Sequence, residues 1–141
     1  MVRPKFLGWA LILYAALWMA IHRGSLAWHV SQLPLLSLTD GARWTLFVST
    51  NALVEFGAPL GYLACGTGLV RGRPWARRWA LRTAGAAFLL VAAYYAVFID
   101  ILSAHISVWS IGWGFGFKET LHLVFWCAAY RAEPPAPPPA A

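Results

Sequence analysis

The sequence predicts an all-α protein that folds inside a membrane, an integral membrane four-helix bundle. The 141 residues are 60% hydrophobic and only 11% charged. A soluble domain carries about 25% charged residues. Aromatic side chains are abundant, with 9 Trp, 8 Phe and 5 Tyr, and four apolar runs approach or exceed the ~20 residues that a helix needs to cross a bilayer. Together these observations exclude a soluble globular domain, a disordered chain and a disulfide scaffold.

The four expected spans cover residues 6–21, 44–70, 79–102 and 106–130. The first is short, and His22 and Arg23 after it can extend toward the aqueous phase. The second is long enough to tilt or bend. None of the runs alternates in polarity as a membrane β-strand would, so helices are expected. The chain should therefore form one transmembrane domain over residues 1–132, with a proline-rich disordered tail over residues 133–141.

Basic residues predict how the chain is oriented. Most of the 11 Lys and Arg precede the first span, fill the link between the second and third, or follow the fourth. They are Arg3, Lys5, Arg71, Arg73, Arg77, Arg78, Arg82 and Arg131. Only Arg23 and Arg43 flank the link after the first span, so the positive-inside rule places both termini in the cytoplasm. The excess of Arg over Lys is typical of a GC-rich bacterial genome and favours a bacterial inner (plasma) membrane.

The second span carries a polar group that needs an explanation, because an ionisable residue inside a span is costly. Asn51 and Glu55 are one helical turn apart and share a face. Pro59, four residues after Glu55, removes the hydrogen bond to its carbonyl and should kink the helix. Gly57 and Gly61 form a small-xxx-small step, through which another helix can approach closely.

The fourth span carries a second polar group. Lys118 is expected at nearly the same depth as Glu55, so the two can pair if their helices touch. His122 follows Lys118 and Glu119 by about one turn and can lean toward either. Residues 112–116 include three glycines, which predict either close packing or an unwound segment.

These residues make up the candidate site. The candidate catalytic residues are Glu55, Lys118, Glu119 and His122, and the candidate ligand-binding residues are Asn51, Pro59 and Asp100. Asp100 should lie at the outer interface. The alternative is structural, with Glu55 and Lys118 as a buried ion pair that fixes helix register. The sequence lacks metal-ligand spacings, nucleotide-binding loops and nucleophile motifs, so neither a metal nor a cofactor is expected.

The second span, with Glu55 one turn before Pro59 and a basic end, resembles the EXPERA-domain family of sterol isomerases and ligand receptors. The resemblance covers this span alone and implies a membrane-embedded site for an apolar molecule.

The small size, belt aromatics and glycine-rich faces instead favour a non-enzymatic accessory or assembly subunit of a larger membrane complex. Its partners would be the lipid bilayer and other membrane proteins or a second copy, and no nucleic acid, because the basic residues cluster at span ends. One alternative is a stand-alone isomerase-like enzyme or a receptor for an apolar small molecule. A further alternative is a small transporter or proton relay that uses the same Glu/Lys/His cluster.

Overall fold

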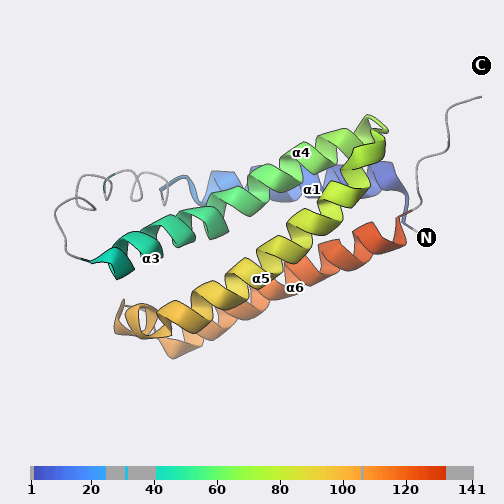
Figure 1. Ribbon diagram of the computed structural model, residues 1–141. Coiled ribbons are helices and arrows are strands. Elements are labelled where there is room, and N and C mark those ends of the chain that lie inside the picture. Colours follow the sequence, from blue (N-terminus) through green and yellow to red (C-terminus); the bar gives the residue numbers. More distant parts are fainter. Residues whose placement is uncertain (1, 25–30, 32–40, 106, 133–141) are drawn as a thin grey trace, which may run out of the picture.

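The computed structural model is all-helical over the residues that it describes, 2–24, 31, 41–105 and 107–132 (Figure 1). Its helices are α1 (Pro4–Ile21), α3 (Ala42–Ala52), the π-helical turn η1 (Leu53–Gly57), α4 (Ala58–Val70), α5 (Pro74–His105) and α6 (Val108–Arg131). The backbone stays helical from α3 through η1 into α4, so these three elements form one continuous rod. The expected tail, residues 133–141, lies outside the described residues.

Three helical segments are long and apolar enough to cross a membrane: Pro4–Ile21, Ala42–Val70 and Pro74–Asp100. The prediction of a helical membrane protein is confirmed at this level. The helix α6 has the length of a span, but it carries Lys118, Glu119 and His122 and is not among these three. A fourth crossing therefore stays a prediction.

The third helix differs most from its predicted boundaries. It begins earlier than expected, at Pro74, because proline fits the first turn of a helix, where its missing N–H has no partner to lose. Arg77 and Arg78 consequently lie on α5 and not in a link. The helix runs on to His105, and its dihedral angles depart from the helical region at Phe98 (φ −113°, ψ 16°).

Glycines set how closely the helices approach. The helix α1 packs along α4 and α6 along α5, and α4 joins the two pairs by packing against α5. A Cβ on Gly66 would lie 2.6 Å from the carbonyl oxygen of Gly8, so the α1 and α4 backbones touch there. A Cβ on Gly61 would lie 2.7 Å from Thr83 on α5. Gly57 and Gly61 line one groove together with residues of α5. The predicted close approach is therefore found at Gly61, whereas a Cβ on Gly57 would contact only Leu53 of its own rod.

Two hydrophobic clusters form the interior. One lies toward the end where α4 and α6 finish, and includes Leu11, Tyr62 and Phe125. The other lies toward the end where α3 and α6 begin, and includes Phe47 and Phe98. The fold is therefore held by two separate cores along its length.

The described ends of the chain meet at one end of the fold. Val2 forms an isolated parallel β-bridge with Ala132. Arg77 of α5 donates from Nε to the carbonyl of Ala129 (3.1 Å) and from a terminal nitrogen to the carbonyl of Tyr130 (2.8 Å), which caps the last turn of α6. The turn between α4 and α5 lies at the same end (Figure 1), so most of the basic residues gather there.

Candidate functional site

The polar residues of η1 and α6 lie between the two hydrophobic clusters. Glu55 directly follows Val54, which belongs to the cluster at the α3 end. On α6, residues 118–122 lie between Ile111 of that cluster and Phe125 of the other. The polar side chains therefore lie at the boundary between the two clusters.

The helix accommodates Pro59 without breaking. The π-helical turn η1 precedes the proline, and its flanking residues keep helical dihedral angles, so the expected kink takes the form of a π-bulge. The carbonyl of Glu55 would normally receive the N–H that Pro59 lacks. Trp18 of α1 supplies that donor instead, with Nε1 3.0 Å from the oxygen.

The same tryptophan contacts the lysine of α6. Lys118 Nζ lies 5.5 Å from the centre of the Trp18 ring, within range of a cation–π interaction. The carboxylate of Glu55 is close enough to interact electrostatically with Lys118 and with Tyr94 and Tyr95 of α5. Lys118 thus has the Trp18 ring against its ammonium group and Glu55 within range of an electrostatic interaction.

His122 pairs with a residue that the sequence did not indicate. Its Nδ1 lies 2.8 Å from the hydroxyl of Tyr62 on α4. Both side chains are buried, at 2% and 0% exposure. Tyr14 and Phe125 pack edge-on or tilted against the Tyr62 ring, with centroids 5.7 and 5.1 Å away. The histidine is therefore fixed by α4, whereas the sequence predicted a contact with Lys118 or Glu119.

Glu119 is separate from these contacts. The residue is 8% exposed, and both carboxylate oxygens are buried without a hydrogen-bond partner among the described residues. Buried polar groups are nearly always paired. This carboxyl group is therefore the least satisfied polar group in the candidate site.

The predicted ligand-binding residues are scattered. Asn51 is half-buried near the end of α3, one turn before Glu55, and Pro59 is buried in α4. Asp100 lies toward the other end of α5, where it forms an exposed ion pair of 2.8 Å with Arg43 of α3. Asp100 lies about 9 Å further along α5 than Tyr94, which interacts electrostatically with Glu55, and it ties α3 to α5.

The contacts of this cluster join three helices. Trp18 connects α1 to η1, and Tyr62 connects α4 to His122 on α6. Lys118 of α6 in turn contacts the Trp18 ring of α1. Since α6 packs mainly along α5, these polar contacts connect it to the α1–α4 pair. Chemically, the Tyr62–His122 pair could pass a proton between the phenol and the imidazole, because both groups donate and accept.

Sequence reasoning missed Trp18 and Tyr62. A signal for Trp18 exists: Tyr14, Trp18 and His22 repeat every four residues on α1, which places three rings on one face. His22 stacks on Trp18 at 4.1 Å, and Tyr14 lies 5.8 Å from the same ring. Such a stripe on a short span indicates an inward face. Nothing in the sequence singled out Tyr62.

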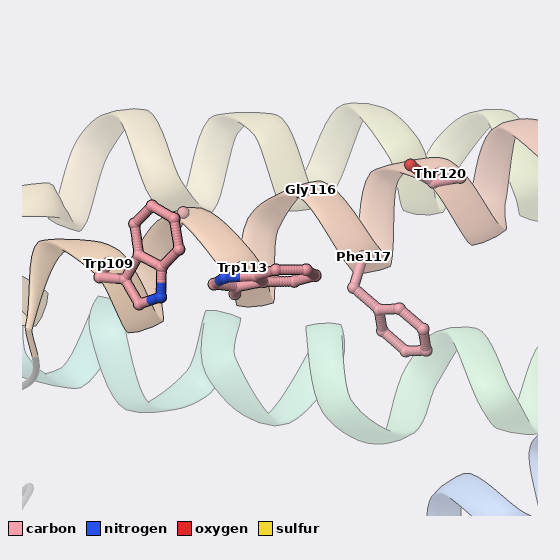
Figure 2. Close-up of a pocket in the computed structure, with 6 residues that line it drawn as sticks. Trp109, Trp113, Gly116, Phe117 and Thr120 are labelled. Carbon is pink, nitrogen blue, oxygen red and sulfur yellow. The ribbon is translucent and has the colours of Figure 1, made fainter.

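A second feature lies on the outer side of α6. A groove of about 560 Å³ is lined by Trp109, Gly112, Trp113, Gly116, Phe117 and Thr120, all from this helix. Figure 2 shows the rings of Trp109, Trp113 and Phe117 in succession along α6, with Gly116 and Thr120 on the same stretch. The glycine-rich segment is helical and not unwound. Nothing lies within 4 Å of a Cβ built on Gly112 or Gly116.

Comparison of the chain with protein-family models, with curated proteins and with solved structures finds no match.

Proposed function

We propose that this protein is an accessory or assembly subunit of a larger membrane complex, and that it docks through the outer face of α6. The supporting observation is the open groove on this helix, in which Gly112, Gly116 and Thr120 repeat every four residues between exposed aromatic rings. In lipid, small residues at this spacing let a second helix approach closely enough for backbone packing. Such a face is suited to a transmembrane helix of another subunit or of a second copy.

Most other glycines in the helices are already in close contact with a neighbouring helix, which supports α6 as the docking face. Gly8, Gly61 and Gly66 are occupied by close contacts within the chain, and a Cβ on Gly114 would lie 3.0 Å from the hydroxyl of Tyr95. The α6 pair Gly112 and Gly116 has no such internal use. Gly57 is also open, but its partner Gly61 is in contact with Thr83, so among the described residues the open pair of glycines four residues apart is the one on the outer face of α6.

In this proposal the polar cluster has a structural role. Its contacts join α1, α4 and α6, and an ordered α6 is what presents the groove in one orientation. The chain crosses the inner membrane four times in the proposed arrangement, with both termini on the cytoplasmic side, where the gathered basic residues satisfy the positive-inside rule.

The test is gentle extraction in native lipids, followed by native mass spectrometry of the particle. The wild-type chain should carry a stoichiometric partner subunit or a second copy. Gly112→Leu and Gly116→Leu should each release that partner, because the added side chain fills the groove. Gly57→Leu is the control on the rod formed by α3, η1 and α4, since Gly57 is exposed and a Cβ there would contact only Leu53 of the same rod.

Two outcomes contradict the proposal. Loss of the partner in Gly57→Leu but not in the α6 variants would move the docking face to the α4 side. A wild-type particle that contains one protein copy and a specific lipid or pigment would mean that the chain works alone.

The second outcome is what the alternative function expects. A membrane-embedded enzyme or receptor for an apolar molecule is favoured by one observation, the buried Glu119 carboxyl group without a partner among the described residues, since a bound ligand could supply the missing contact. In that case Glu119→Gln or Glu55→Gln should abolish ligand retention while the particle stays folded, whereas a subunit should keep its partner in both variants.

A further inference from the structure

A groove on α4 ends at the basic turn between α4 and α5. Its volume is about 320 Å³, and its apolar wall is formed by Leu60, Leu63, Ala64 and Thr67. The Thr67 hydroxyl donates to the carbonyl of Leu63 at 2.8 Å, so it presents no unpaired polar group to the groove. This wall suits a hydrocarbon chain.

The turn fixes two arginines at the end of the groove. The N–H of Arg73 bonds to the carbonyl of Gly68 (2.8 Å) and that of Gly72 to the carbonyl of Leu69 (3.1 Å), which is a Schellman motif. Gly72 takes the positive φ of 68° that this turn requires. Arg71 and Arg73 both line the groove. Neither guanidinium group has a hydrogen bond or ion pair within the described part of the chain.

An indole covers the side of this charged end. A Cβ on Gly68 would lie 2.9 Å from the ring of Trp75, so the missing side chain is what lets Trp75 lie against α4. Trp75 is half-exposed, and it lines the groove beside the two arginines. Tryptophan is enriched where the bilayer meets water, which sets the depth of the charged end at the headgroup level.

The length of the groove matches one leaflet. From Leu60 to Arg71 the helix rises about 16 Å, close to half of a hydrocarbon core of about 30 Å. We infer that this groove binds one anionic phospholipid, with an acyl chain along α4 and the phosphate between Arg71 and Arg73. Two positive charges that have no partner among the described residues, above an apolar channel, match a molecule with a negative head and a long apolar tail.

The experiment titrates the detergent-solubilised full chain with phosphatidylglycerol, and with phosphatidylcholine of the same acyl chains, and counts bound lipid by native mass spectrometry. Charge-assisted hydrogen bonds contribute enough that Arg71→Gln with Arg73→Gln should weaken phosphatidylglycerol binding about tenfold or more. The matched control, Arg3→Gln with Arg78→Gln, removes two exposed charges from the same end outside the groove. It should change the affinity by about twofold at most.

A second variant tests the apolar part without changing charge. Ala64→Trp fills the groove at an exposed position of α4, so it should also reduce phosphatidylglycerol binding while the helical content, measured by circular dichroism, stays constant. Equal losses in the two double variants would mean diffuse attraction to anionic lipid and would overturn the inference. So would unchanged binding in Ala64→Trp, or equal competition by soluble glycerol 3-phosphate, which would indicate an anion site without an acyl-chain groove.

Discussion

The hydrogen bond from Trp18 to the carbonyl of Glu55 is the contact whose removal tests most of the reasoning about the polar cluster. Trp18→Phe deletes the donor and keeps most of the ring. Interhelical hydrogen bonds in a membrane protein contribute about 0.6 kcal/mol on average and about 1.7 at most. The weaker attraction of a phenyl ring for Lys118, 5.5 Å away, should cost a further ~0.5–1 kcal/mol. The free energy of unfolding should therefore fall by about 1.1–2.7 kcal/mol.

A second substitution separates the two contributions. Pro59→Ala restores a backbone N–H four residues after Glu55, which can bond to the same carbonyl in a regular helical turn. In the Pro59→Ala background, Trp18→Phe should cost less by about 0.6–1.7 kcal/mol, the hydrogen-bond part. The share of the cost that comes from the weaker cation–π contact with Lys118 should be unchanged, because Pro59→Ala alters only the hydrogen bonding of the Glu55 carbonyl.

The assay is equilibrium unfolding by SDS in mixed micelles, monitored by far-ultraviolet circular dichroism. It is applied to the wild type, Trp18→Phe, Pro59→Ala and the double variant. Trp9→Phe is the matched control, because Trp9 is on the same helix and is 55% exposed. It should change the free energy of unfolding by less than about 0.5 kcal/mol. If Trp18→Phe costs the same with Pro59 as with alanine, Trp18 does not replace the missing backbone donor and the explanation of the π-bulge is wrong.

Three further predictions use the same unfolding assay. Tyr62→Phe should destabilise the protein by about 1–2 kcal/mol, since it leaves the buried Nδ1 of His122 without its partner; an unchanged stability would contradict the assigned bond. Gly66→Ala should cost about 1–3 kcal/mol, because its Cβ would lie 2.6 Å from a backbone oxygen of α1, whereas Gly112→Ala, with open space around it, should leave the stability of the single chain unchanged. Asp100→Asn should cost less than about 1 kcal/mol, because the ion pair that it breaks is exposed, and a larger loss would mean that this pair is shielded from solvent.

The helical class and the positions of the helices were accessible from the sequence because they depend on composition and run length. Lipid leaves the backbone few alternatives to a helix, so apolar runs translate almost directly into helices. The start of α5 was missed for a local reason. Basic residues after Pro74 looked like a polar link, but a proline at the first turn favours a helix there.

The partners within the site were less accessible. Depth arithmetic along straight helices brought Glu55 and Lys118 to a similar level, and the structure places them within electrostatic range. Such arithmetic says nothing about rotation of a helix around its axis, which decides whether His122 meets Lys118 or Tyr62. Rotation follows from packing of whole faces, and the close contact of Gly66 with Gly8 is one of the contacts that set it.

The same limit explains the glycines. In the sequence, Gly57 and Gly61 share the spacing of a packing motif, and so do Gly112 and Gly116. In the structure the space beside Gly61 is taken by Thr83 of α5, whereas the space beside Gly112 and Gly116 is open. Spacing alone predicts that two small residues face the same way, but only the arrangement of all helices tells whether that side is already covered.

If α6 forms the predicted fourth crossing, its composition makes its insertion depend on the other helices. A charged side chain at the centre of a lone helix costs about 2.5–3.5 kcal/mol on insertion scales, and α6 is not among the segments apolar enough to cross unaided. Lys118 contacts the Trp18 ring and His122 contacts Tyr62, so α1 and α4 contact two of the three central ionisable side chains of α6. The third, Glu119, stays unsatisfied within the described residues. If α6 crosses the membrane as proposed, it is stable there only when α1 and α4 are in place, so its proposed docking face would be presented only after the chain has folded.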